Sequence, residues 1–520
     1  MKLKYNIGIL ALLLSLGSAC DDGTLDHGDI NIPDRPADGD ENFEDDGIAE
    51  EPTTNAILEI KFANENRHQV IDGFGCAFAE WSHRIYTNTQ REEVLRELFD
   101  PKTGLGLNIF RGEPFPHYEN PATGEIDFGM KRTYKLSASD PSLVNGFWDY
   151  YNGVEAGKAV QLGQMWLFDI ISNRYKDVSF ILSTWSPAPS MKTNGSAKGG
   201  SLKEGQEKNY ANYLIQFIKE YEKKFGIKIY AISPANEPNT DTNPWSCCLW
   251  QPEDLAKFCV ENLRPALDNA GLQETKIIFG EHSWWRNGAD YVKEGFEAYP
   301  ELANPERTIA AGHGYSLGSG TKYLQYDAAV EKGVHVWNTE TSSTDTYNGS
   351  WDNAMFWAES FHKYLSEANL NSFIWWAGAR PCVNNESLIV LQEKVPGETY
   401  TKPDRFYSYG QFTKFIPRGS YRVDVESVYE NGTENPLPDN LLRSAYVTDD
   451  TYTMVLVNKS EEKIDTRISL SDREFQNMRM YTSDENVKWK YTKINPAPSG
   501  ARWISIPAKS VVTVTGNIKK

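Results

Sequence analysis

Short apolar runs alternate with longer amphipathic stretches along the chain from Gln69 onward. This alternation is typical of repeated strand–helix units. Eight apolar runs have the length of a strand, at residues 70–78, 107–111, 179–185, 229–235, 276–281, 308–313, 334–339 and 372–377. Eight such units in succession predict one closed (β/α)₈ barrel, a TIM barrel of the α/β class.

Two of the stretches between these runs have a clear helical spacing. Residues 206–225 and 253–270 place apolar side chains at three- and four-residue intervals. Gly226 and Gly271 follow them, where the left-handed backbone that ends many helices favours glycine. We therefore expect a helix in each stretch.

Beyond residue 413 the pattern changes to short alternating strands separated by polar turns, at residues 442–447, 452–458, 466–470, 478–482 and 503–514. Such strands predict an antiparallel β-sandwich. Residues 56–62 alternate in the same way, so we expect 56–66 to supply a first strand of that sandwich. The side domain is then discontinuous, with the barrel at 67–412 and the rest of the sandwich at 413–520.

The N-terminal residues have a different character. Lys2 and Lys4 precede an apolar run of about ten residues, which is too short to span a bilayer, and small residues then lead to Cys20. Residues 1–19 therefore predict an export signal. Cys20 resembles the residue that becomes the lipidated N-terminus of a bacterial lipoprotein, and an ordinary cleaved signal is the alternative.

Residues 20–55 are rich in acidic residues, Gly and Pro, and we expect them to form a flexible tether. An acidic stretch after the lipidated cysteine is similar to the surface-export signal of Bacteroidetes lipoproteins. These features predict an exported bacterial lipoprotein of the outer membrane or cell surface, which meets the membrane through its lipid only.

Composition narrows the range of partners. The 520 residues carry a net charge of −19, and residues 1–52 contribute −10 of it, which leaves −9 for the rest. No nucleic-acid partner is expected, because phosphate binding needs clustered Lys and Arg. The mean hydropathy of −0.55 excludes a protein with many membrane spans. We expect a monomer.

The sequence indicates no metal and no cofactor. It contains no HExxH, P-loop or dinucleotide-binding glycine pattern. Besides Cys20 there are five cysteines, and no pair has the CxxC spacing of a zinc site; they are Cys76, Cys247, Cys248, Cys259 and Cys382. Disulfides from Cys247 and Cys248 to distant partners and buried free thiols are both open.

Polar and aromatic residues stand at the carboxyl ends of the predicted strands, where (β/α)₈ barrels carry their chemistry. They are Arg111, Trp185, Asn236, Glu237, Glu281, His282, His313, Tyr315, Glu340, Trp375, Trp376 and Arg380. Paired carboxylates serve glycoside hydrolysis, in which one protonates the leaving oxygen while the other attacks the anomeric carbon. Ten of the 15 tryptophans lie between Trp185 and Trp376, and flat aromatic rings pack against sugars.

Four motifs in this order resemble glycoside hydrolase family 30. They are Val-Ile-Asp-Gly-Phe-Gly at 70–75, Ser-Thr-Trp-Ser-Pro-Ala-Pro-Ser-Met-Lys-Thr-Asn-Gly at 183–195, Ser-Pro-Ala-Asn-Glu-Pro at 233–238 and Trp-Asn-Thr-Glu at 337–340. The likeness extends over about residues 56–516. It implies a barrel with a side β-sandwich and a retaining, double-displacement mechanism on β-glycosides.

The resemblance also implies roles for individual residues. Glu237 would be the acid/base and Glu340 the nucleophile. Asn236 would bind the sugar 2-hydroxyl, Arg111 would help to keep Glu340 ionised, and His313 and Tyr315 would line the same subsite. Trp185 and Trp376 are expected in the cleft. Glu281 either binds sugar directly or supports a neighbouring residue.

The polysaccharide or oligosaccharide substrate is less defined. The segment 375–380 resembles the xylanase-like branch, in which an Arg grips the glucuronate of substituted xylan, so a (glucurono)xylan-type endo-β-xylanase is the leading hypothesis. Arg380 would then bind that carboxylate, or it pairs with a nearby Glu instead. A β-1,6-glucanase, a β-1,6-galactanase and a glucosylceramidase-like β-glucosidase are alternatives within the family. A catalytically silent glycan-binding lipoprotein and a purely structural surface protein are alternatives of other classes.

Overall fold

The computed structural model describes residues 55–79, 81–86, 88–119, 125–128, 154–242, 245–315, 323–392, 400–429, 434, 436–494 and 502–519. The predicted signal at 1–19, Cys20 and all but the last residue of the predicted tether lie outside the described residues. Among the described residues, no helix is both long and apolar enough to cross a membrane.

The predicted eight-stranded parallel barrel is confirmed. Its strands pair in the closed order β11-β3-β4-β5-β6-β7-β8-β9, and all of these pairs are parallel. The strands are β3 (Gly73–Ala77), β4 (Ile109–Gly112), β5 (Ser179–Ser183), β6 (Ile229–Ser233), β7 (Lys276–His282), β8 (Thr308–His313), β9 (His335–Thr341) and β11 (Ser372–Trp375).

Branched apolar side chains fill the interior of the barrel. The interior cluster combines isoleucines from five strands with Ala231, Ala311 and Trp337; the isoleucines are Ile109, Ile181, Ile278, Ile309 and Ile374. These residues are at most 1% exposed. Because this layer closes the middle of the barrel, polar side chains reach the interior only beyond it, toward the strand ends.

Helices cover the outside of the barrel. They are α1 (Ser82–Tyr86), α2 (Arg91–Phe99), α3 (Val154–Arg174), α4 (Glu207–Phe225), α5 (Pro252–Phe258), α6 (Arg264–Asn269), α7 (Trp285–Ala298), α8 (Asp327–Val330), α9 (Trp351–Ser366) and α10 (Asp404–Thr413). Helix α4 matches the prediction, with left-handed Gly226 after it.

The helix expected over 253–270 is interrupted. A π-helical turn, Cys259–Leu263, joins α5 to α6. Pro265 explains the interruption, since it has no N–H to donate to the carbonyl four residues earlier and its ring crowds that carbonyl.

The side domain is built from two sheets. One has the order β17-β1-β20-β23 and the other the order β2-β16-β18-β19-β24-β21-β22. Their strands are β1 (Ala56–Ile60), β2 (Arg67–Val70), β16 (Tyr421–Val423), β17 (Val425–Tyr429), β18 (Leu441–Val447), β19 (Thr451–Asn458), β20 (Ile464–Leu470), β21 (Met478–Ser483), β22 (Lys490–Ile494), β23 (Arg502–Ile506) and β24 (Ser510–Asn517).

The N-terminal strand β1 lies inside the four-stranded sheet. It pairs antiparallel with β17 and parallel with β20. The side domain is therefore discontinuous in sequence, and it contains one parallel pair within an otherwise antiparallel arrangement.

Two expected strands are divided in the structure. The run 70–78 was expected as one barrel strand, but Val70 ends β2 in the side domain, and the barrel strand starts at Gly73. Gly73 has a φ of +134°, and a Cβ there would lie 2.2 Å from Asn108 Oδ1, so the bend requires glycine. The run 503–514 splits into β23 and β24, which belong to different sheets.

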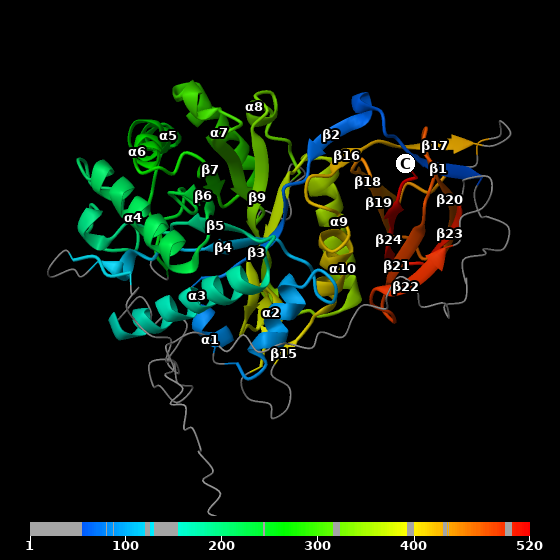
Figure 1. Ribbon diagram of the computed structural model, residues 1–520, viewed down its shortest axis with the longest axis horizontal. Coiled ribbons are helices and arrows are strands. Elements are labelled where there is room, and N and C mark those ends of the chain that lie inside the picture. Colours follow the sequence, from blue (N-terminus) through cyan, green and yellow to red (C-terminus); the bar gives the residue numbers. More distant parts are fainter. Residues whose placement is uncertain are drawn as a thin grey trace, which may run out of the picture.

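Helices α9 and α10 lie between the barrel and the side domain (Figure 1). Gln411 on α10 donates from Nε2 to Ser483 Oγ at 2.8 Å, and its carbonyl accepts from Thr513 Oγ1 at 2.8 Å. The two domains share a continuous apolar cluster at this junction, because Tyr446, Val455 and Val511 pack with the barrel core.

Short strands follow the seventh and eighth barrel strands. They are β10 (Ser343–Thr346), β12 (Ala377–Arg380), β13 (Asn384–Asn385), β14 (Ser387–Leu391) and β15 (Tyr400–Thr401). β10 pairs with β13, and β12 pairs with β14. These pairs fix the chain around Arg380 beside the carboxyl ends of β9 and β11.

Candidate active site

The predicted site residues meet at the carboxyl ends of the barrel strands. Arg111 lies on β4, Glu281 on β7, and His313 and Glu340 on β8 and β9. The others stand in the connections that follow the strands: Trp185 after β5, Asn236 and Glu237 after β6, Tyr315 after β8, and Trp376 after β11.

Arg111 is the centre of a buried polar network. Its Nη1 donates to Glu340 Oε2 at 2.7 Å, and its Nη2 lies 2.6 Å from Asn236 Oδ1 and 3.3 Å from Glu281 Oε1. Ser183 completes the network, since its hydroxyl donates to Glu281 Oε2 at 2.5 Å. The planar fork of an arginine thus holds two carboxylates and one amide in fixed positions.

His313 lies between the two predicted catalytic carboxylates. Its Nδ1 is 3.2 Å from Glu237 Oε1 and 3.9 Å from Glu340 Oε1. One ligand atom from each of these three side chains lies within 4.8 Å of the other two. Glu340 Oε1 also accepts a hydrogen bond from the Tyr315 hydroxyl at 2.7 Å, and Glu237 Oε2 accepts one from Thr240 Oγ1 at 3.3 Å.

The backbone at two of the acidic residues is strained. Glu237 has a φ of +45° and Glu281 a φ of +51°, a region that residues other than glycine seldom adopt. The Glu237 N–H donates to the Glu281 carbonyl at 3.0 Å, so neighbouring strand ends hold each other in this conformation. The arrangement aims both side chains at the interior of the strand ends.

Buried charges set the protonation of His313 and Glu281. Burial lowers the pKa of His313, but Glu340, Glu237 and Glu281 outweigh it and raise that pKa to about 9. Burial raises the pKa of Glu281, but Arg111 and His313 outweigh it and hold that pKa well below its usual range. At neutral pH, His313 is therefore a cation and Glu281 an anion.

Glu340 and Tyr315 respond to the same surroundings. Burial raises the pKa of Glu340, while His313 and Arg111 act in the opposite direction. Burial, and then the charge of Glu340, raise the pKa of Tyr315 well above its usual value. Tyr315 therefore remains a hydrogen-bond donor to Glu340. The prediction that Arg111 favours the ionised form of Glu340 agrees in sign, although burial has the larger effect.

An aromatic wall extends from this network toward Arg380. The Arg111 guanidinium lies 4.9 Å from the centre of the Trp185 ring, which is 5.7 Å from Trp376. Trp376 lies 4.9 Å from Trp81, and the Arg380 guanidinium lies 5.2 Å from the Trp81 ring. Arg380 Nη2 also pairs with Glu386 Oε2 at 3.3 Å. Arg380 thus pairs with a nearby Glu, one of the two arrangements that its sequence position left open.

Most of the tryptophans between Trp185 and Trp376 do not belong to this wall. Trp285, Trp337, Trp357 and Trp375 are each under 2% exposed and pack in the core. The tryptophan-rich segment predicts a sugar-binding cleft, but much of it serves packing. Bulky aromatic rings are enriched in both settings, so composition alone does not separate them.

Four residues of the site were not singled out from the sequence. Ser183 and Thr240 bind site carboxylates, and Trp81 and Glu386 complete the wall around Arg380. Ser183 and Trp81 follow the strand-end rule, because each ends or follows a barrel strand. Thr240 and Glu386 lie deeper in loops, and the sequence carries no signal for them.

Glu237, His313 and Glu340 are also the one group among the described residues in which three or more possible metal ligands lie within 4.8 Å of one another. Arg111 already holds Glu340 Oε2 and adds a positive charge beside the cluster, which disfavours a cation. The five described cysteines carry free thiols, and all but Cys382 are buried.

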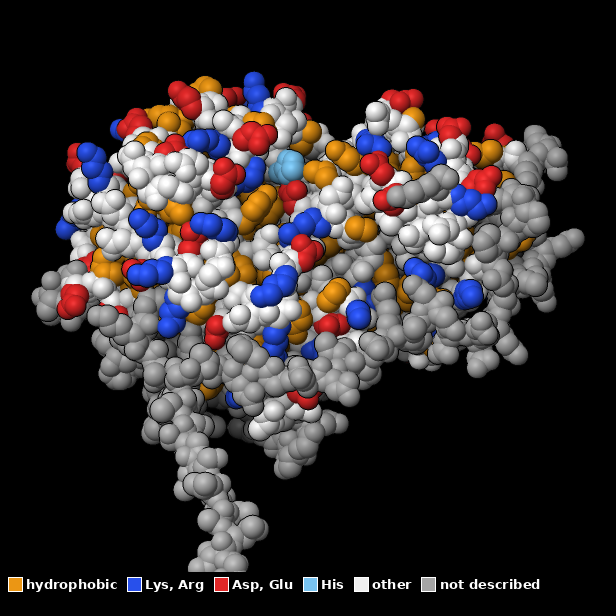
Figure 2. All heavy atoms as spheres, in the orientation of Figure 1, with side chains coloured by type: hydrophobic (Ala, Val, Ile, Leu, Met, Phe, Trp, Pro, Cys, Tyr) orange, Lys and Arg blue, Asp and Glu red, His pale blue; other side chains and the backbone are white. Residues whose placement is uncertain are grey.

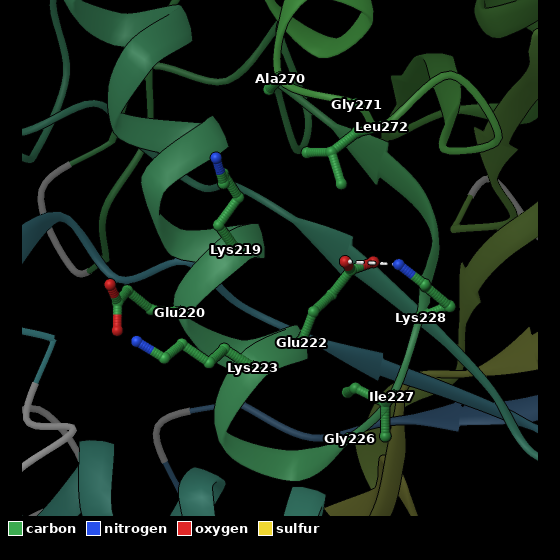
Figure 3. A pocket seen from close by; sticks show the side chains of 10 residues that line it. All are labelled: Lys219, Glu220, Glu222, Lys223, Gly226, Ile227, Lys228, Ala270, Gly271 and Leu272. Carbon is green, nitrogen blue, oxygen red and sulfur yellow. Dashed lines mark hydrogen bonds and ion pairs between the residues drawn. The ribbon is translucent and has the colours of Figure 1, made fainter.

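A surface depression lies at the opposite end of the barrel (Figure 3). Its lining comes from the end of α4, the turn before β6 and the turn before β7: Lys219, Glu220, Glu222, Lys223, Gly226, Ile227, Lys228, Ala270, Gly271 and Leu272. It contains none of the predicted site residues. Basic and acidic side chains are mixed over the molecular face in Figure 2, so this face has no continuous basic surface.

A closed (β/α)₈ barrel with buried carboxylates at its strand ends and a side β-sandwich defines a barrel hydrolase of the glycosidase kind. Residues 164–377 match the family model of the glycosyl hydrolase family 30 TIM-barrel domain. Most of the barrel is therefore similar to the family 30 domain, and the protein is a glycoside hydrolase that acts on a carbohydrate substrate.

Similarity extends beyond the family match. The chain is 27% identical over 461 residues to the lysosomal acid glucosylceramidase of Mus musculus, which covers 82% of each chain. It is 23% identical over 384 residues to an endo-1,6-beta-D-glucanase of Neurospora crassa, with 70% of this chain and 74% of that one covered. In fold, it resembles the catalytic domain of GH30 xylanase C from Talaromyces cellulolyticus, with a TM-score of 0.66, 22% identity, and coverage of 89% of this chain and 100% of that one.

Proposed function

We propose that the protein is a retaining β-glycosidase in which Glu237 is the acid/base and Glu340 the nucleophile. The observation that carries this proposal is the spacing of the two carboxylates. An oxygen of Glu237 and an oxygen of Glu340 lie within 4.8 Å of each other. Retaining enzymes hold their carboxyl groups about 5 to 5.5 Å apart, whereas inverting enzymes need roughly 6.5 to 9.5 Å to admit a water between them.

The first step forms a covalent intermediate. Glu340 attacks the anomeric carbon, and Glu237 gives its proton to the glycosidic oxygen as the bond to the leaving group breaks. Tyr315 and Arg111 each bind one oxygen of Glu340, so the carboxylate has a fixed direction of attack. In the second step Glu237 takes a proton from water, whose oxygen attacks the same carbon and releases Glu340.

In this proposal, Asn236 binds the sugar during both steps. Its Oδ1 accepts from Arg111 at 2.6 Å, which leaves the amide Nδ2 to donate to the 2-hydroxyl. A hydrogen bond to this hydroxyl strengthens as positive charge develops at the anomeric carbon, so the contact favours the transition state. Glu281 is tied to Arg111 and Ser183, and we assign it to supporting them rather than to binding sugar.

A neutral β-glucoside is the substrate class that we favour. Arg380 is paired with Glu386, and Glu386 Oε2 also accepts from Asn384 Nδ2 at 2.8 Å. A glucuronate would have to displace or repel this carboxylate to reach Arg380. The named relatives, a glucosylceramidase and an endo-1,6-β-glucanase, point to a glucosyl unit as well. The glucuronoxylan hypothesis for Arg380 therefore becomes the second candidate.

Two variants test the mechanism. Glu340→Gln should lower the turnover of 2,4-dinitrophenyl β-glucoside by more than the roughly 10²- to 10⁴-fold contribution of a general acid–base group. Glu237→Ala should accumulate the glycosyl-enzyme on that substrate, and added azide should restore turnover by forming β-glucosyl azide, because azide attacks without a general base. Full activity of Glu340→Gln, or an α-configured azide product, would contradict the assignment. Binding of glucan without any hydrolysis by the unaltered protein would favour the silent glycan-binding alternative.

The substrate class has its own test. Initial rates of the unaltered protein on β-1,6-glucan, β-1,6-galactan, glucosylceramide, xylan and glucuronoxylan would rank the candidates. Arg380→Ala should leave the ratio of rates on glucuronoxylan and unsubstituted xylan unchanged if Glu386 already neutralises Arg380. A selective loss on glucuronoxylan would support the xylanase hypothesis instead.

We also propose that the protein is exported and anchored through a lipid on Cys20. The support is the sequence of residues 1–20, since these residues lie outside the described structure. In a bacterial host, Cys20→Ala should release the protein from the membrane fraction and abolish labelling with radioactive palmitate. Unchanged membrane association would contradict the proposal.

A further inference from the structure

One aromatic side chain on a segment bonded to the loop of the proposed acid/base is open to solvent. Trp284 follows β7 and precedes α7, and 55% of its surface is exposed. It is the most exposed of the tryptophans that the structure describes. A large ring left in water lacks the free energy that burial gives, and a tryptophan with its backbone fixed next to a site has the flat apolar face that a sugar ring can cover.

Hydrogen bonds fix the backbone of Trp284 beside Glu237. The neighbouring Ser283 accepts from Asn239 Nδ2 at 2.7 Å, and the Ser283 N–H donates to Asn239 Oδ1 at 3.1 Å. Asn239 stands two residues after Glu237, so these bonds tie the Trp284 segment to the loop of the acid/base.

The other side of the segment is tied to the strand of His313. Trp284 forms an antiparallel bridge with Gly314, which lies between His313 and Tyr315. Trp284 is therefore held between the loop that carries Glu237 and the strand end that carries the residues around Glu340. Its position is set by the barrel and not by a free loop.

The chemistry of the acid/base assigns a side of the cleft to this segment. Glu237 protonates the oxygen that joins the glycosyl unit to the leaving group, whereas Glu340 lies under the glycosyl unit itself. Glu340 is held by Arg111 and Tyr315, whereas the Glu237 carboxylate contacts His313 and Thr240, and the loop that follows it is bonded to the Trp284 segment through Asn239 and Ser283. An exposed side chain on the segment bonded to the Glu237 loop is therefore a candidate contact for the leaving group.

We propose that Trp284 is a stacking platform for the leaving-group sugar, and that its ligand class is a neutral pyranose ring. The proposal rests on the proposed function and adds that the natural leaving group is itself a sugar. A flat ring presents its C–H face to the indole, and the two-torsion side chain orders at low entropic cost. The same platform binds acceptor sugars in the second step.

The platform therefore predicts glycosyl transfer. An acceptor hydroxyl oxygen attacks the anomeric carbon of the glycosyl-enzyme, the bond from that carbon to Glu340 breaks, and the hydroxyl proton passes to Glu237. The products are a new glycoside and the free Glu340 carboxylate. Water and the acceptor compete for the same intermediate, so their product ratio reports directly on acceptor binding.

The test compares two leaving groups in one enzyme. The leaving group of gentiobiose is a sugar, whereas that of β-glucosyl fluoride is a fluoride ion. For Trp284→Ala, we expect the ratio of kcat/KM on gentiobiose to kcat/KM on the fluoride to fall about tenfold or more, with Trp284→Phe between the two. With the fluoride as donor and gentiobiose as acceptor, the ratio of transfer to hydrolysis should fall by a similar factor.

The matched control removes another exposed aromatic ring. Phe356 on α9 is 42% exposed, and Phe356→Ala should leave both ratios unchanged. An unchanged kcat/KM ratio and an unchanged transfer ratio in Trp284→Ala would overturn the platform, as would a folded variant that loses both substrates in equal proportion. Glu340→Gln must abolish turnover of the fluoride. A failure there would contradict the proposed function itself and is thereby distinguished from a failure of Trp284.

Discussion

The two ends of the barrel interior differ in their polar content: the carboxyl ends contain a network of buried charges, and the amino ends contain packed aromatic rings. At the carboxyl ends of the strands, Arg111, Glu281, His313 and Glu340 are all buried and linked to one another. At the amino ends, Trp337 stacks on Tyr230 at 6.0 Å. The polar group bound next to this pair is the Asp72 carboxylate, which contacts Trp337 Nε1 and His335 Nδ1.

The surface depression and the cluster of buried ionisable groups therefore lie at different ends of the barrel. The depression in Figure 3 lies at the amino ends and is lined by side chains of which Lys228 and Glu222 form an ion pair. The carboxyl ends instead contain four buried ionisable groups whose pKa values are shifted from their ordinary values. Burying charge costs free energy, so a cluster that does so is retained for another reason, and under the proposed function that reason is catalysis.

Loss of Arg111 should produce the largest effect on this contrast. Arg111→Ala leaves Glu281 and Glu340 buried without their cation, and breaking a buried pair costs about 3 to 5 kcal/mol. The free energy of unfolding, measured by urea denaturation, should fall by that amount. Arg111→Lys keeps the charge but not the planar fork, so its free energy of unfolding should lie between those of the unaltered protein and Arg111→Ala. A loss below about 1 kcal/mol would show that the network is not coupled to the fold.

The raised pKa of His313 predicts a second effect on stability. Its pKa of about 9 in the folded protein exceeds the ordinary value of 6.5, so its proton stabilises the fold fully below pH 6.5, and this contribution is lost as the pH rises through 9. Glu281 has the opposite pH dependence. Because its pKa is lowered in the folded protein, its ionised form stabilises the fold at neutral pH, and this stabilisation is lost as the pH falls into the acid range.

The measurement is the free energy of unfolding between pH 6.5 and 9, with His313→Gln as the comparison. The unaltered protein should lose stability over this interval, and the variant should lose less. Parallel curves for the two proteins would mean that His313 is not the titrating group.

The sequence predicted the frame of the site better than its contacts. Alternating apolar runs located all eight barrel strands, and the strand-end rule then brought Arg111, Asn236, Glu237, His313 and Glu340 into one network. Strand order and residue position are local properties, because each strand needs only its own apolar run and the helix that follows it.

Contacts that depend on loops were not predictable in the same way. Glu386 reaches Arg380 because β12 pairs with β14 and because the Trp375 indole donates to the Glu386 carbonyl at 2.7 Å. Neither contact follows from a periodic pattern. The fate of the tryptophans is similar, since Trp375 and Trp376 are adjacent in sequence but the first packs in the core and the second joins the wall.

At the amino end, Trp337→Phe should have a moderate effect. The change keeps an aromatic ring against Tyr230 but removes the hydrogen bond from Nε1 to Asp72 Oδ2, which measures 2.7 Å. An unpaired buried partner costs about 1 to 3 kcal/mol, and His335 continues to bind Asp72, so the lower part of this range is expected. Thermal unfolding would measure the change, and a loss as large as that of Arg111→Ala would remove the contrast between the two ends.

The smallest effect is expected for Lys228 in the amino-end depression. Its ammonium lies 3.2 Å from Glu222 Oε2, but its side chain is 85% exposed, so Lys228→Ala should cost under about 1 kcal/mol. Glu222→Ala should cost more than this, because Glu222 Oε1 also accepts from the Ile229 N–H at 3.0 Å, where β6 begins. Hydrolysis of β-glucosides should be unchanged by Lys228→Ala. A clear loss of activity would mean that the depression takes part in function and that buried charge does not by itself mark the active end of this barrel.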